Sequence, residues 1–171
     1  MKIPPKSRYK EKLEFLLKNQ NISRIPLCGN LFPNCHGTSL WILGASGKIK
    51  ENPRLVINKG DDLNKLSKAT FPLTDTPFYA GSEVLRWFID RHGETVRSRQ
   101  EDSLFVIRGL MESLDGLDYE DDLHSGIFLG GDEGVCFEQH ERGSPFRLLT
   151  LDELIHDYSY SKPPEFYKIK I

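Results

Sequence analysis

The feature that most constrains the fold is a pair of short apolar segments joined by Gly-Gly-Asp-Glu-Gly. The segments run from His124 to Leu129 and from Val135 to Gln139. A glycine-rich connection between two β-rich segments is typical of an antiparallel hairpin. Side chains alternate between the two faces of a strand, so four large apolar residues of this hairpin fall on one face. This face carries Ile127, Leu129, Val135 and Phe137. The sequence therefore predicts a sheet whose apolar side faces a core.

The opposite face of the hairpin brings together residues with acid–base chemistry. It carries His124, Gly126, Cys136, Glu138 and His140. A carboxylate or a second imidazole beside a histidine fixes its tautomer and stabilises the imidazolium. We therefore expect His124 to be a base oriented by Glu138 or, alternatively, by His140. In a regular hairpin Gln139 points away from this face, and a bulge would reverse that.

Helical periodicity dominates the first half of the chain. Helices are predicted over residues 9–19 and 82–92, the second capped by Ser82 and stopped by Gly93. A short strand over 55–57 and a helix over 61–67 are predicted between them.

The second half of the chain has the composition of strands. Strands are predicted over 103–107 and 146–149, with an acidic, solvated loop over 110–122. Thr150 and Glu153 form a capping-box pattern for a helix to about residue 158, and residues 166–171 alternate like an edge strand. Helices first and antiparallel strands afterwards predict an α+β fold, with N-terminal helices packed on a C-terminal antiparallel sheet.

The segment Asn34-Cys35-His36-Gly37 opens a short apolar run that ends at Gly44. Asn34 suits an N-cap, so we expect a helix that begins at Cys35; the alternative is a buried strand over 38–43. A cysteine in the first turn faces unpaired N–H groups and the positive end of the helix dipole, which favour the thiolate. The same N–H groups can bind an oxyanion. Cys35 is therefore a candidate nucleophile, and a buried packing role is the alternative.

The composition fits one domain over residues 1–171. The net charge is −2, and hydrophobic residues make up 38% of the chain, which argues against nucleic acid or a bilayer span as partner. The N-terminus lacks the apolar region of a signal peptide, so we expect a cytoplasmic product that reaches any outside target by another route. The three cysteines lack a CxxC pattern. We therefore expect neither disulfides, nor a metal, nor a cofactor.

These motifs together resemble the NlpC-type cell-wall peptidase family, which has a compact papain-like fold. The resemblance covers roughly residues 33–158, from NCHG through EDSLFVI, HSGIFLG and VCFEQ to FRLLTLDELI. It implies that Cys35 is the nucleophile, His124 the base and Glu138 the third residue. The catalytic core would span 34–158, behind an N-terminal helix within residues 1–20.

The chain departs from the family pattern beside the nucleophile. Asn34 and His36 replace the family's Asp and Ser, and the family's upstream Tyr is missing. Together with Gly37, these two residues are expected to contact the substrate. The resemblance implies a cysteine hydrolase that cleaves an amide bond, most simply in a peptidoglycan stem peptide, through a thioester acyl-enzyme. The alternatives are an acyltransferase or deamidase at the same site, or a non-catalytic binding module of the same fold.

Overall fold

The computed structural model describes residues 1–58, 67–159 and 161–171. Its sheet has six antiparallel strands in the order β1-β6-β2-β3-β4-β5. The strands are β1 Gly93–Thr95, β2 Ser103–Met111, β3 Tyr119–Gly130, β4 Val135–Gln139, β5 Phe146–Thr150 and β6 Glu165–Ile169. The α-helices are α1 Lys10–Lys18, α2 Cys35–Ile42, α3 Ser46–Lys50, α4 Ser82–His92 and α5 Leu151–Asp157. Two 3₁₀ helices, η1 and η2, span Gln20–Arg24 and Pro53–Leu55.

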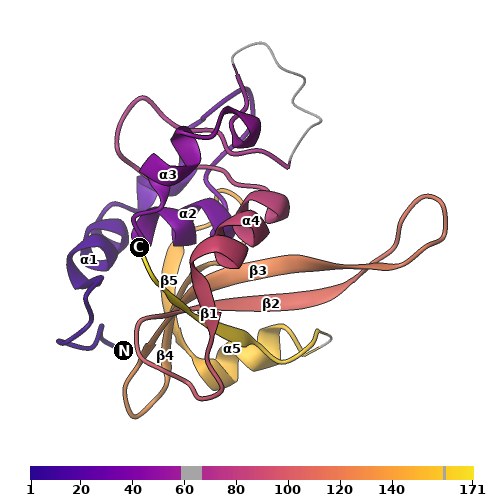
Figure 1. Ribbon diagram of the computed structural model, residues 1–171. Helices are drawn as coiled ribbons and strands as arrows, with labels where there is room; N and C mark the ends of the chain where they lie inside the picture. The colour runs from indigo at the N-terminus through magenta and orange to yellow at the C-terminus, as the bar shows by residue number, and fades with distance from the viewer. Residues whose placement is uncertain (59–66, 160) are drawn as a thin grey trace.

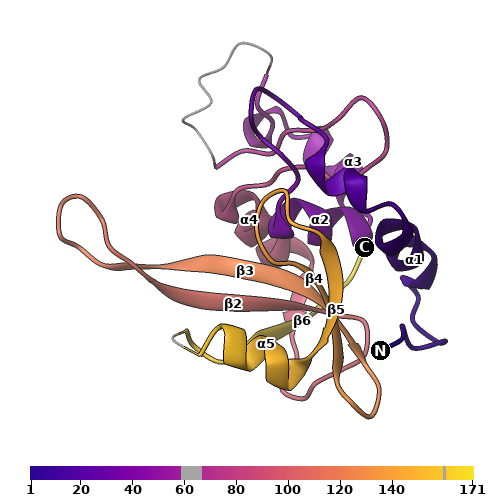
Figure 2. The ribbon, with the colours of Figure 1, turned by 180° about the vertical axis from the view of Figure 1, so that it is seen from behind.

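The helices cover both faces of the sheet unequally. Helices α1 to α4 lie on one side and α5 on the other (Figures 1 and 2). The larger core lies on the first side and includes Leu40, Phe88, Ile127 and Phe137. A smaller core beneath α5 includes Phe105, Cys136 and Leu154. The predicted α+β class is confirmed, with N-terminal helices packed against an antiparallel sheet.

Helix α2 begins where its cap predicts. The Asn34 side chain accepts a hydrogen bond from the Gly37 N–H at 2.9 Å, and Gly44 has a φ of +78° just beyond the helix. The helix prediction is confirmed there, and the alternative strand over 38–43 is wrong. Helix α4 has its predicted bounds, but its N-cap is Gly81, which has no side chain to cap it, so the predicted Ser82 cap is wrong.

Two parts of the sheet differ from the sequence prediction. The loop is shorter than the predicted 110–122, because β2 and β3 remain paired from Arg108–Asp122 to Met111–Tyr119 and only residues 112–118 lie outside the strands. The two strands project as a two-stranded arm (Figure 1). At the outer end of the arm, successive residues 110–111 and 119–120 are all exposed, so the sequence carries no apolar alternation to mark it. The predicted edge strand at the C-terminus is an internal strand, since β6 pairs with both β1 and β2.

The remaining predictions have mixed outcomes. The capping box of Thr150 and Glu153 is present at the start of α5. The strand predicted over 55–57 is absent: η2 ends at Leu55, and Val56 forms an isolated bridge to Ala69. The helix predicted over 61–67 falls, except for its last residue, outside the described residues. None of the described helices combines the length and apolar character that crossing a membrane requires.

The N-terminus of α2 is held by a segment that crosses it closely. Asn34 Nδ2 donates to the Ala80 carbonyl at 2.8 Å, and the Ala80 N–H donates to Asn34 Oδ1 at 3.0 Å. A Cβ on Gly37 would lie 1.7 Å from the Phe78 carbonyl oxygen. Glycine at position 37 is therefore what lets the 78–80 backbone reach the Asn34 cap.

Replacing Gly37 with alanine should destabilise the fold. The added Cβ meets backbone rather than a movable side chain, so we expect the free energy of unfolding to fall by roughly 3 kcal/mol. Urea denaturation followed by circular dichroism measures it. The matched control is Gly47→Ala in α3, where a Cβ meets nothing within 4 Å and should add up to about 1 kcal/mol. Equal stabilities for Gly37→Ala and the unmodified chain would contradict this account.

Candidate active site

Cys35 is the first residue of α2 and is half-buried. Its sulfur lies 3.7 Å from His36 Nδ1, and His124 is also near enough to interact with it. Burial by itself would raise the pKa of the Cys35 thiol, but the charges and hydrogen bonds of His36 and His124 outweigh burial and hold it well below its ordinary value. The site therefore favours the thiolate, which is the nucleophilic form of cysteine.

His124 lies on β3 and is 1% exposed. Its Nε2 is hydrogen-bonded to Glu138 Oε2, and its ring stacks on Tyr158 with centroids 4.7 Å apart. Nδ1 is buried without an ordinary hydrogen bond, which leaves it as the nitrogen available to the Cys35 thiol. Burial would lower the pKa of His124, yet the Cys35 and Glu138 charges raise it to about 9.

Residues from both faces of β3 and β4 contribute to the surroundings of Cys35. Gln139 and Ser125 face α2: Gln139 Oε1 accepts from Thr38 Oγ1 at 2.7 Å, and its Nε2 donates to the Pro33 carbonyl at 3.1 Å. Their neighbours in sequence, Glu138 and His124, face α5. The last β3–β4 pair is Gly126–Glu138, so the two strands are unpaired beyond it toward His124. Cys35, on the helix side, interacts with the imidazole of His124 where this pairing ends.

Glu138 is 1% exposed and holds two cationic partners. One oxygen bonds His124, and the other accepts a hydrogen bond from Arg147 Nε at 2.7 Å. Arg147 also donates to Asp157 Oδ2 at 2.8 Å. Burial would raise the pKa of Glu138, but His124 and Arg147 hold it below its ordinary value. Glu138 is therefore a charged group that orients His124 and stabilises its imidazolium.

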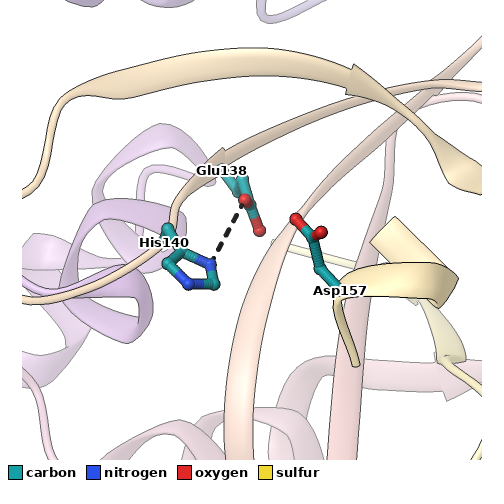
Figure 3. Close-up of side chains that lie close together, drawn as sticks. All are labelled: Glu138, His140 and Asp157. Carbon is teal, nitrogen blue, oxygen red and sulfur yellow. Dashed lines mark ion pairs between the residues drawn. The ribbon is translucent and has the colours of Figure 1, made fainter. Parts of the chain in front are cut away.

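His140, the alternative orienting residue, contacts the carboxylate rather than the base. Its Nδ1 lies 3.8 Å from Glu138 Oε1 and 3.1 Å from the Tyr158 hydroxyl. Its ring centroid is 6.2 Å from that of His124. In Figure 3 both His140 and Asp157 approach the Glu138 carboxylate. His140 thus supports the site through Glu138 and Tyr158.

The same three side chains form a candidate metal site by their spacing. One ligand atom from each of Glu138, His140 and Asp157 lies within 4.8 Å of the others (Figure 3). The guanidinium of Arg147, however, bonds both carboxylates. A metal would have to displace this cation, so the donor set is better matched to the arginine that occupies it.

The three residues predicted to contact substrate make internal contacts. Asn34 caps α2 and binds Ala80, and Gly37 packs on Phe78. His36 is 5% exposed, with Nε2 2.9 Å from the Asp122 carbonyl oxygen. All three therefore fix the position of Cys35.

Sequence reasoning missed the residues that surround the predicted triad. Arg147 pairs with Glu138 across β4 and β5, and extending the predicted strand register would have found it. Tyr158 and Asp157 come from the end of α5, whose docking no local pattern indicates. Tyr158 and His140 also line a hollow of about 680 Å³ with Leu110, Leu123 and Lys162. A hollow of that volume beside the site can take a substrate group.

Comparison with family models, curated proteins and solved structures finds no match to this chain. Any proposal for the function therefore rests on the geometry of the site.

Replacing Glu138 with glutamine should leave His124 and Arg147 without their buried partner. We expect the free energy of unfolding at pH 7 to fall by about 3 kcal/mol, the lower end of the cost of breaking a buried pair. Because the folded pKa of Glu138 is lowered, its contribution is complete above its unfolded value of about 4.3 and is lost as the pH falls through the folded value.

Acid should accordingly destabilise the unmodified protein more steeply than Glu138→Gln. Urea unfolding between pH 3 and 7 measures both curves. The control is Glu133→Gln, at an exposed position in the β3–β4 turn. Parallel acid dependence in the unmodified protein and Glu138→Gln would contradict the buried-carboxylate account.

Proposed function

We propose that the protein is a cysteine hydrolase that cleaves an amide bond. The observation that carries this proposal is the buried constellation in which Cys35 lies between two imidazoles and His124 is held by Glu138. A thiol at a helix start, a histidine within its reach and a carboxylate behind the histidine are the parts of a nucleophile–base–orienter site. Cys136 is unsuited to this role, since burial raises its pKa to about 12.

Cys35, His124 and Glu138 each have a separate role in the proposed reaction. His124 Nδ1 holds the thiol proton while the Cys35 sulfur attacks the carbonyl carbon. Glu138 stabilises the imidazolium. The amine leaves with the proton from His124, and a thioester remains on Cys35. Water, deprotonated by His124, then releases the acid and restores the thiolate.

The first turn of α2 supplies a place for the oxyanion. Asn34 accepts hydrogen bonds from two of the N–H groups of this turn. The Asn34 side chain accepts from the Gly37 N–H, and the Asn34 carbonyl accepts from the Thr38 N–H at 2.9 Å. Among the described residues, the N–H groups of Cys35 and His36 have no such acceptor. These two donors, beside the reacting sulfur, are the ones we assign to the oxyanion.

The proposed fold is papain-like, of the NlpC type. Support comes from the cysteine helix packed on an antiparallel sheet whose neighbouring strands carry His124 and Glu138. The proposed substrate, by the same resemblance, is a peptidoglycan stem peptide. An acyltransferase or deamidase would use the same thioester with another acceptor or another amide.

The reactivity of Cys35 tests the site before any substrate is known. With Cys28→Ser as background, iodoacetamide should alkylate Cys35 at pH values well below the roughly 8.5 of a free thiol. His124→Ala should move the curve toward that value, and His156→Ala, at an exposed position on α5, should not. Peptide mass spectrometry identifies the modified residue. A Cys35 that reacts like a free thiol in all variants would sink the catalytic proposal and favour a binding module.

Purified peptidoglycan tests the substrate. We expect soluble peptides to be released by the unmodified protein and by Cys28→Ala, and release by Cys35→Ala to be slower by a factor of at least about 10³. The rate should decline as the pH rises through about 9, because His124 loses the proton that the leaving amine needs. A reactive Cys35 with no release from any wall type would reject this substrate and leave the other acyl reactions.

A further inference from the structure

The side chain of His36, a second imidazole beside Cys35, has no part in the mechanism above. His36 Nδ1 lies 3.7 Å from the Cys35 sulfur, and the ring is 5% exposed. A buried imidazole is costly unless both nitrogens have partners. Here they do: Nε2 lies 2.9 Å from the Asp122 carbonyl oxygen, and Nδ1 lies 2.9 Å from Ser125 Oγ. The ring is thus fixed between α2 and β3 with one nitrogen toward the sulfur.

The hydrogen-bond directions define the protonation of His36. The Asp122 carbonyl can only accept, so Nε2 carries a proton. Ser125 Oγ donates its single proton to Ser39 Oγ at 3.2 Å, and Ser39 Oγ donates to the Cys35 carbonyl at 2.8 Å. This donation makes Ser125 an acceptor toward His36, an arrangement that favours a proton on Nδ1 as well. With both nitrogens protonated, His36 is an imidazolium.

The charges around His36 fit this state. The negative Cys35 sulfur raises the pKa of His36 against the opposing effects of burial and of the like-charged His124, and the net direction is upward. The Asp122 carboxylate is itself held by Arg86 at 2.6 Å and Arg108 at 3.1 Å. The contacts of the ring with Ser125 and the Asp122 carbonyl are neutral.

We propose that His36 is a positioning residue whose imidazolium shares its Nδ1 proton between Ser125 and the Cys35 thiolate. The inference rests on the proposed cysteine chemistry and adds a division of labour to it. His124 accepts and returns the reacting proton. His36 keeps its proton throughout, stabilises the negative sulfur and fixes its direction. The thiolate is thus held by two imidazoles, and part of its stabilisation is independent of the base.

Single and double variants separate the two histidines. In the Cys28→Ser background, the thiolate absorbance at 240 nm is titrated against pH, with Cys35→Ala as blank. We expect His36→Gln, whose amide can still donate to Asp122, to raise the thiol pKa by about one unit, a tenfold loss of thiolate on the acid side. His124→Ala should raise it too, yet leave it below about 8.5, and the double variant should reach that value.

The outcomes distinguish the two proposals. A folded His36→Gln whose titration superimposes on that of the unmodified protein overturns the role of His36 and leaves the proposed function standing. An unmodified Cys35 that titrates like a free thiol overturns the proposed function itself. Urea midpoints establish that each variant is folded.

A second measurement leaves His36 in place, in case the substitution prevents folding. The ¹⁵N shifts of the His36 ring are followed against pH in the unmodified protein and in Cys35→Ser. We expect both ring nitrogens to be protonated at pH 7 when the thiolate is present, and the ring to lose its second proton at least one pH unit lower in Cys35→Ser. Identical titrations in the two proteins would overturn the proposal, because an imidazolium that stabilises the thiolate must itself be stabilised by the thiolate charge.

Discussion

The buried carboxylate of Glu138 is the interaction on which the rest of the site depends. It is 1% exposed, and a charge in that position persists only with compensating cations and donors. His124 and Arg147 provide them, and Arg147 continues the network to Asp157 on α5. The orientation of the proposed base, the pairing of β4 with β5 and the docking of the last helix are therefore coupled through one side chain.

The second constraint is the anchoring of the α2 N-terminus. Asn34 caps the helix and binds the 78–80 segment, while Gln139 contacts residues on both sides of Cys35. Because the sheet residues beside Cys35 alternate between faces, Gln139 and Ser125 hold the helix while Glu138 and His124 form the buried pair. The backbone of Cys35 is thus placed by hydrogen bonds of its neighbours in α2, while the charge of the sulfur is set by His36 and His124.

Much of the site was predictable because strand alternation and helix caps are local rules. The position of the hairpin turn, the bounds of β4, the shared face of His124 and Glu138 and the helix start at Cys35 required no distant contacts. The arm of β2 and β3 was missed because its exposed residues show no apolar period. The internal position of β6 was missed because the sequence of a short strand does not show whether another strand pairs with its second edge. His36 was expected toward the substrate, and its burial depends on β3, a distant segment.

The sequence by itself determined the α+β class, the start of the cysteine helix and the polar face that carries His124 and Glu138. Each of these follows from periodicity or capping within a few residues. The tertiary structure alone decided that His36 turns inward to Cys35 and that Tyr158, at the end of α5, stacks on His124. These contacts join segments whose relative placement is set by packing, and no local pattern encodes the distance between them.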